Sequence, residues 1–166
     1  MIENKLKKGL GRGLSSLLGD TSKKIQTSKV SINEIIRNKF QPRKNFNKES
    51  LDELTKSIKE QGVIQPIVVR PNKSSDGKYE IIAGERRWIA SQNAGLHEVP
   101  IVVLDVDDVK SLEFAIVENV QRQDLNPIEE ARGYQRLTDE FNYNQDKLSN
   151  FIGKSRSYIA NSLRLL

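Results

Sequence analysis

The stretch "EIIAGERRWIA", residues 80–90, combines the end of an apolar run with the start of a helix. Residues 79–83 have the pattern of a short strand, and residues 85–94 have the pattern of a helix that stops at a glycine. Arg86 and Arg87 therefore fall in the first helical turn, beside unbonded N–H groups and the positive end of the helix dipole. Cations do not stabilise a helix there, so the pair indicates that an anion binds at this helix start.

The segments around this stretch predict a small α+β unit with few strands. Asn47 is a good N-cap for a preceding helix, and Gly62 is a good stop for it. Residues 63–70 then have the pattern of a strand, which Pro66 should place at a sheet edge or at a bulge. A further apolar strand is expected at residues 99–105.

The chain after residue 105 has helical patterns only. One helix is expected from about residue 108 to 121, and a second starts at Asn126-Pro127, a cap followed by proline at the first helical position. The apolar face expected for this second helix consists of Ile128, Ala131, Tyr134, Leu137 and Phe141.

The segment "NQDKLSNFIGKSRSYIANSLRLL", residues 144–166, has the pattern of a helix-turn-helix. Gly153 suits the turn and Ser155 can cap the second helix. This helix should direct Ile159, Leu163 and Leu166 to the core, and Arg156, Ser157, Asn161 and Arg164 to solvent or DNA. Such side chains near a helix start can donate to phosphates and base edges.

Composition narrows the classes of function. The 166 residues contain no cysteine, which excludes thiolate chemistry and disulfides. They contain one histidine, His97, which argues against histidine-rich metal sites. No apolar run is long enough for a membrane span and no secretory signal is evident, so the cytoplasm is the expected compartment. The net charge of +5 is concentrated in residues 1–29, and residues 142–166 are also basic, which favours a polyanionic partner.

Three polar motifs are candidates for a phosphate site. Gly84 permits close approach of an anion to the arginine pair, although pairing with nearby carboxylates is an equally good explanation. In "ENVQR", residues 118–122, Glu118 and Asn119 are hard oxygen donors suited to Mg²⁺, yet taken alone a polar helix end is the better explanation. The loop "QPRKNF", residues 41–46, means little by itself.

The order of these motifs closely resembles the ParB family of chromosome-partitioning proteins. The resemblance is carried by "FQPRKNF", "SLDELTKSIKEQGVIQPIVVRP", "YEIIAGERRWIA", "AIVENVQRQDLNPIEEARGYQRL" and "GKSRSYIANSLRLL". It implies an α+β fold class, with a small ParB/sulfiredoxin-like N-terminal domain followed by an all-helical helix-turn-helix DNA-binding domain. The expected divisions are a basic tail at 1–28, a CTP-binding domain at 29–122 and the DNA-binding domain at 123–166.

The resemblance also implies a function. Family members bind CTP with Mg²⁺, recognise the centromere site parS, form dimers that close into a sliding DNA clamp, and hydrolyse CTP slowly to CDP and phosphate. "GLGRGLSSLL" near the N-terminus resembles the segment that stimulates the partner ATPase, ParA. The protein should then be cytoplasmic and nucleoid-associated, without a membrane partner. Because the family continues past "LRLL" with a dimerisation domain, the chain is expected to be an N-terminal fragment.

Residue roles carried over by motif are as follows. The nucleotide site would comprise Gln41, Arg43, Gly62, Gln65, Pro66, Gly84, Glu85, Arg86, Arg87, Glu118, Asn119 and Arg122. Glu118 and Asn119 would also bind Mg²⁺ and act in catalysis. The DNA-binding residues would be Lys154, Ser155, Arg156, Ser157, Asn161 and Arg164, and Lys8 and Arg12 would engage ParA.

Three other interpretations stay open. A related nucleoid-occlusion factor would share the CTP site and the DNA motif but would use its N-terminus to reach a membrane. A helix-turn-helix regulator without nucleotide function would leave the arginine pair and "ENVQR" unexplained. The third is an enzyme on the same α+β domain, such as a sulfiredoxin or a small-molecule kinase. A sulfiredoxin would need a loop cysteine, which this chain lacks. A small-molecule kinase would have no need of the helix-turn-helix.

Overall fold

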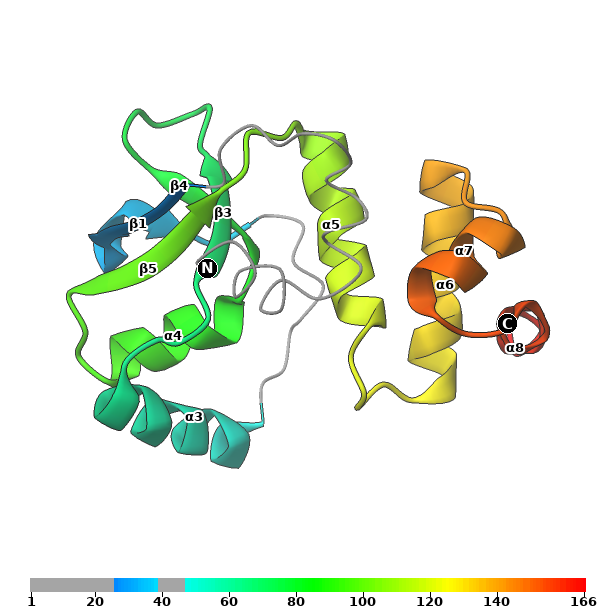
Figure 1. Ribbon diagram of the computed structural model, residues 1–166, viewed down its shortest axis with the longest axis horizontal. Helices are drawn as coiled ribbons and strands as arrows, with labels where there is room; N and C mark the ends of the chain where they lie inside the picture. Colours follow the sequence, from blue (N-terminus) through cyan, green and yellow to red (C-terminus); the bar gives the residue numbers. More distant parts are fainter. Residues whose placement is uncertain (1–25, 39–46) are drawn as a thin grey trace, which may run out of the picture. The chain divides into compact units, whose positions relative to one another are not determined.

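The computed structural model describes residues 26–38 and 47–166 (Figure 1). The described residues form two compact units, one that ends at Asp108 and one that begins at Val109. The first is a mixed sheet with two helices, and the second is helical. This agrees with the expected α+β domain followed by a helical domain.

A five-stranded sheet in the order β1-β5-β3-β4-β2 forms the centre of the first unit. The β5–β3 and β4–β2 pairs are parallel, whereas β1–β5 and β3–β4 are antiparallel. The strands are β1 (Gln26–Ser31), β2 (Ile35–Ile36), β3 (Ile67–Pro71), β4 (Tyr79–Ala83) and β5 (Glu98–Val103).

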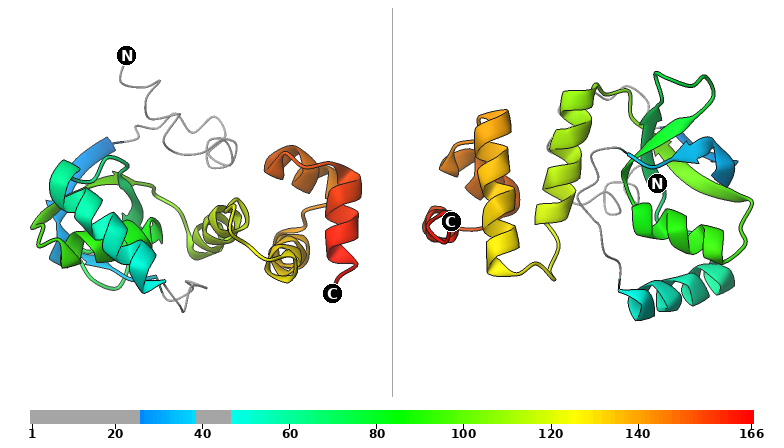
Figure 2. Two further views of the ribbon diagram at one scale, coloured as in Figure 1. Left: turned by 90° about the horizontal axis from the view of Figure 1, so that it is seen from below. Right: turned by 180° about the vertical axis from the view of Figure 1, so that it is seen from behind.

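Two helices, α3 (Lys48–Gln61) and α4 (Glu85–Asn93), complete this unit. Helix α4 packs against β3 and against a short 3₁₀ helix, η1 (Ile32–Glu34), and α3 lies beside α4 (Figures 1 and 2). The expected caps of α3 are confirmed, since Asn47 accepts a hydrogen bond from the N–H of Glu49 at 3.0 Å and Gly62 has φ +72°. The core of the sheet consists of Ile32, Ile35, Ile67, Val69, Ile81, Val99 and Ile101.

The expected edge position of the strand after Gly62 is wrong. Strand β3 starts at Ile67 and lies between β5 and β4, in the middle of the sheet. Pro66 precedes the strand, so its missing N–H removes no bond from the ladder. The register shift between Val68 and Val69 does agree with the alternative expectation of a bulge. The N-terminal tail also ends earlier than residue 28, because β1 begins at Gln26 and pairs with β5.

The second unit contains α5 (Asp108–Val120), α6 (Pro127–Phe141), α7 (Gln145–Ile152) and α8 (Arg156–Leu163). Helix α8 packs on both α6 and α7 (Figure 2). The core joins Ile116, Val117, Val120, Tyr134, Leu137, Tyr143, Leu148 and Ile159. Within the described ranges, no helix is long and apolar enough to cross a membrane.

Two expected core residues of this unit are exposed. Ile128 is 40% exposed because it lies in the first turn of α6, ahead of the buried stretch of that helix. Leu166 is 51% exposed because α8 ends at Leu163, so the helical period that predicted its burial does not extend to it. The expected cap of α6 is confirmed as a full capping box between Asn126 and Glu129.

Candidate functional site

The start of α4 brings a glycine and an arginine into close contact. Gly84 is the N-cap of this helix, with φ +98° in the left-handed region that favours glycine. A Cβ atom at this position would lie 3.2 Å from Cζ and Nη2 of Arg87. Glycine is therefore favoured at position 84 for two reasons. It adopts the positive φ without strain, and it leaves room for the guanidinium of Arg87.

Arg87 joins this helix start to the turn before β3. Its Nη1 donates to the backbone carbonyl of Gln65 at 2.9 Å and to that of Pro66 at 2.7 Å. Two segments that the sequence assigned to one site, residues 62–66 and 84–87, are thus brought together. Ile64, in the same turn, is 77% exposed, which gives the turn an apolar surface.

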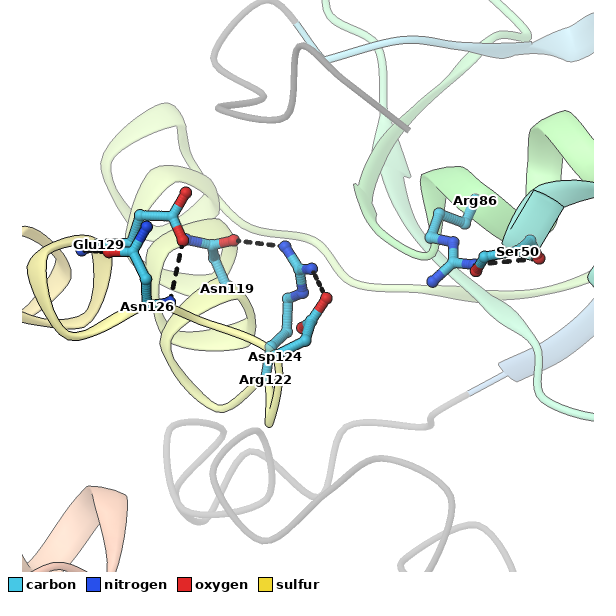
Figure 3. A network of polar contacts seen from close by, with 7 residues as sticks. All are labelled: Ser50, Arg86, Asn119, Arg122, Asp124, Asn126 and Glu129. Carbon is cyan, nitrogen blue, oxygen red and sulfur yellow. Dashed lines mark hydrogen bonds and ion pairs between the residues drawn. The ribbon is translucent and has the colours of Figure 1, made fainter. Parts of the chain in front are cut away.

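Arg86 points in a different direction, toward the first turn of α3. Its Nη2 donates to the backbone carbonyl of Ser50 at 3.3 Å and to the Ser50 hydroxyl (Figure 3). Arg86 and Arg87 thus place two guanidinium groups in the first turn of α4, each with hydrogen bonds to oxygens of another segment. A positive site of this kind at a helix start is suited to a phosphate group.

Glu85, between the glycine and the arginines, is a buried acid. Its side chain is 5% exposed and forms an ion pair with Arg37, which follows β2. Sequence reasoning placed Glu85 in the site but missed Arg37, because nothing in the local pattern links residue 37 to residue 85.

The second group of candidates lies at the end of α5. Glu118 and Asn119 are half-buried in the last turn, and Arg122 donates from Nη1 to Oδ1 of Asn119 at 3.3 Å. Arg122 also pairs with Asp124, which fixes the guanidinium between α5 and the following loop (Figure 3).

The donor set at the end of α5 fits Mg²⁺ in chemistry but is small. It offers one carboxylate and one amide oxygen, and no group of three or more His, Cys, Asp or Glu side chains suited to a metal occurs in the described part of the chain. Mg²⁺ commonly takes one or two protein oxygens and completes its shell with water and substrate phosphates. The residues therefore fit a nucleotide-associated Mg²⁺ and not a site made by protein alone.

The residues expected at the nucleotide site are divided between the two units. Residues 84–87 belong to the unit that ends at Asp108, and residues 118–122 to the unit that begins at Val109. Gln41 and Arg43 lie outside the described residues, as do Lys8 and Arg12.

The helix-turn-helix expected at the C-terminus is present. Gly153 has φ +76° between α7 and α8, and the Ser155 side chain accepts from the N–H of Tyr158 at 3.1 Å as the N-cap of α8. Arg156 pairs with Asp146 of α7 at 2.9 Å. The residues expected to bind DNA are all exposed: Lys154, Ser155, Arg156, Ser157, Asn161 and Arg164.

One residue of α8 was missed. Tyr158 is 41% exposed, lies 5.1 Å (ring centroid) from Nζ of Lys154, and donates its hydroxyl hydrogen to Glu130 of α6 at 2.9 Å. The signal in the sequence was an aromatic residue, Tyr158, among the polar residues of the exposed side of the helix.

An α+β domain followed by a helix-turn-helix is also the domain order found by comparison with known proteins. The model of the ParB N-terminal domain matches residues 18–120, and that of the ParB HTH domain matches residues 123–166. The chain belongs to the ParB family. The expected family membership is thereby confirmed.

Relatives from two bacteria show how much of the family's length is covered. The chromosome-partitioning protein ParB of Myxococcus xanthus is 55% identical over 170 residues, which cover 96% of this chain and 56% of that protein. The ParB of Caulobacter vibrioides is 48% identical over 169 residues, with the same two coverages. The chain thus spans little more than half the length of these relatives.

Two solved structures of C-terminally truncated ParB from Caulobacter crescentus are similar. The structure in complex with the centromeric parS site has a TM-score of 0.76 and 47% sequence identity. The match covers 83% of this chain and 71% of the chain in that structure. The one in complex with CTP-γ-S has a TM-score of 0.56 and 49% identity, and it covers 84% and 78%.

Proposed function

We propose that this chain is the nucleotide- and DNA-binding part of a chromosome-partitioning protein. It binds parS centromere DNA through α7 and α8 and binds CTP with Mg²⁺ through the start of α4 and the end of α5. CTP binding closes a dimer into a clamp on DNA, and slow hydrolysis to CDP and phosphate reopens it. The N-terminal tail, through Lys8 and Arg12, stimulates ParA, and the protein acts at the nucleoid in the cytoplasm.

The observation that carries the nucleotide part is the positive start of α4. Gly84 has no side chain, and Arg86 and Arg87 lie in the first turn of α4, where both guanidinium groups add positive charge to the helix start. A triphosphate would gain from the helix dipole, from N–H donors and from two planar guanidinium groups. The turn at 62–66, which Arg87 holds, is the proposed contact for the cytosine base, and the exposed Ile64 offers it an apolar surface.

Glu118 and Asn119 are the proposed Mg²⁺ ligands, with Arg122 in support. The ion would neutralise phosphate charge and orient the triphosphate. Arg122 holds the amide of Asn119 through its bond to Oδ1, so that the oxygen is oriented before the ion binds. We further assign Glu118 and Asn119 the catalytic role that the family resemblance implies.

Hydrolysis should be slow, which suits a switch. The chain's only histidine, His97, is exposed just before β5 and is not among the candidate nucleotide residues. The carboxylate of Glu85 is buried and paired with Arg37, so neither group is an unencumbered general base. A long-lived nucleotide complex gives the closed state time to act, and the extent of closure is limited by the differential affinity of CTP for the two states.

The DNA part rests on the geometry of α7 and α8. Basic and amide side chains cluster at the outer side of α8, whose cap at Ser155 leaves the helix start accessible. Lys154 and Arg156 are suited to phosphates, and Asn161, one turn further, to a base edge.

Binding to labelled duplexes tests the proposed function. Fluorescence anisotropy of the intact protein with a parS duplex and with a scrambled duplex of the same length should give an affinity ratio of at least about 10³ at fixed salt. Equal affinities for the two duplexes would contradict parS recognition.

A further inference from the structure

One carboxylate of α6 accepts two phenolic hydroxyl groups. Glu130 Oε1 accepts from the hydroxyl of Tyr134 at 2.6 Å, and its Oε2 accepts from that of Tyr158 at 2.9 Å. Tyr134 is fully buried on the same helix, whereas Tyr158 comes from α8 and is 41% exposed. Glu130 therefore connects the scaffold helix α6 to the proposed recognition helix.

The backbone around Glu130 is held in place by the cap of α6. The N–H of Glu130 donates to the carbonyl of Asn126 at 3.0 Å, and Asn126 and Glu129 exchange the two bonds of the capping box, at 2.8 and 3.1 Å (Figure 3). The buried Tyr134 then fixes one carboxylate oxygen and leaves the other aimed at Tyr158. Such a pre-oriented acceptor can select one position of the side chain that donates to it.

The contact between Tyr158 and Glu130 lies at the first turn of α8, next to the residues proposed to bind DNA. Glu130 and Tyr158 line a groove of about 840 Å³ together with Arg122, Gly153 and Lys154. Helix α8 has only eight residues. Its apolar contacts with the core come from the buried Ile159 and the half-buried Leu163. A short helix held by few apolar contacts can rotate about its axis unless polar contacts fix it, and the Arg156–Asp146 pair between α8 and α7 is exposed at both side chains and so contributes little.

Tyr158 is a hydrogen-bond donor throughout the physiological pH range, because a phenol of ordinary pKa, about 10, is protonated there. The hydrogen bond to Glu130, together with desolvation and the carboxylate's charge, raises the pKa of Tyr158 further.

We propose that the hydrogen bond from Tyr158 to Glu130 is a positioning contact that fixes the rotation of α8 and so sets the discrimination between parS and other DNA. This inference rests on the proposed DNA-binding function. Base-edge contacts require donors in defined places, whereas phosphate contacts tolerate small rotations because charge attraction is less directional. Loss of the bond should thus lower the specificity ratio more than it lowers non-specific affinity.

Three variants of the intact protein test the proposal, with the dissociation constants for parS and scrambled duplexes measured at one salt concentration. Tyr158→Phe should reduce the ratio of the two constants about fivefold, and the constant for scrambled DNA should change less than about twofold. Tyr143→Phe, which removes a buried hydroxyl that donates to Glu113 of α5 and not to Glu130, is the matched control. It should lower the melting temperature and leave the ratio unchanged.

Glu130→Ala supplies the second arm, because a glutamine would keep an oxygen that can still accept from Tyr158. Glu130→Ala should reduce the ratio by a similar factor, and combining it with Tyr158→Phe should add little, because both changes remove the same contact. An unchanged ratio in Tyr158→Phe and Glu130→Ala would overturn the proposal, and equal weakening on both duplexes would show that Tyr158 only touches the DNA backbone. If the unsubstituted protein itself fails to distinguish the duplexes, the proposed function falls as well.

Discussion

The guanidinium of Arg87 lies directly against the backbone of Gly84, so that any Cβ at position 84 would be 3.2 Å from Arg87 Cζ. The same guanidinium donates to two carbonyls of the turn before β3. One arginine thus fixes the turn and the helix start relative to each other. Changes on either side of this contact should therefore alter the proposed nucleotide site more than they alter the fold.

Gly84→Ala should weaken CTP binding by at least about tenfold. The new methyl group would displace Arg87, and alanine at φ +98° would add a strain of about 1–2 kcal/mol. Gly77→Ala is the control, because Gly77 also has positive φ (+77°) but has no atom within 4 Å of a built Cβ. Calorimetric titration should separate the two variants, and equal CTP affinities in both would contradict the assignment of Gly84.

Arg86→Ala should abolish measurable CTP binding and leave the fold intact, because Arg86 is half-buried and bonds the first turn of α3 at Ser50. Ser50→Ala is its control. It removes the hydroxyl partner of Arg86 but keeps the charge, so CTP affinity should fall by no more than about threefold. Wild-type affinity in Arg86→Ala, with an unchanged melting temperature, would remove this arginine from the site.

Gly133→Ala should destabilise the helical unit although alanine is the better helix former. A Cβ at Gly133 of α6 would lie 2.3 Å from Cγ2 of Val120 at the end of α5. Overpacking of this kind costs about 1–3 kcal/mol, which exceeds the roughly 1 kcal/mol gained in helix propensity. In urea unfolding, the double variant with Val120→Ala should lose less than the sum of the single changes, whereas strict additivity would argue against the steric explanation.

The buried Arg70 of β3 should depend on its two carboxylates unequally. It bonds Glu80 through Nε and Nη2, at 3.0 and 2.7 Å, and pairs with Asp108 at 2.6 Å. Glu80 is nearly buried, so Glu80→Gln leaves a buried charge poorly compensated and should cost about 3 kcal/mol of the free energy of unfolding. Asp108 is 67% exposed, so Asp108→Asn should cost about 0–1 kcal/mol. A reversed order in urea unfolding would contradict this ranking.

Lys154→Ala and Asn161→Ala should differ in how they affect DNA binding. Lys154→Ala should weaken binding to parS and scrambled duplexes by a similar factor and reduce the salt dependence by about one counterion. Asn161→Ala should lower parS affinity selectively, by about 1–3 kcal/mol, because an amide that reads a base edge contributes only at the right base. A selective loss of parS affinity in Lys154→Ala and a uniform loss in Asn161→Ala would contradict the assignment of Lys154 to phosphates and Asn161 to a base edge.

Local patterns were enough to predict most helices and their caps. Asn47, Asn126 and Ser155 each accept the N–H bond expected of an N-cap. Such bonds join residues two or three apart, so the sequence near each helix contains the information. The helical period likewise predicted exposed side chains at Arg156, Ser157, Asn161 and Arg164, and these four residues are exposed.

Contacts between distant segments could not be predicted in this way. The central place of β3, the pairing of Arg37 with Glu85 and the bond from Tyr158 to Glu130 each join residues more than 25 positions apart or depend on strand order. Ile128 and Leu166 were misplaced because helical period alone does not tell where a buried face begins or ends.

Selective binding of CTP is the central claim, and calorimetric titration with a slowly hydrolysed CTP analogue in Mg²⁺ tests it most directly. Matching analogues of ATP, GTP and UTP serve as controls, and Arg86→Ala serves as the binding-deficient reference. We expect saturable binding of the CTP analogue alone, lost in Arg86→Ala. Equal binding of all four nucleotides, or binding of none by the intact protein with parS DNA present, would contradict the account.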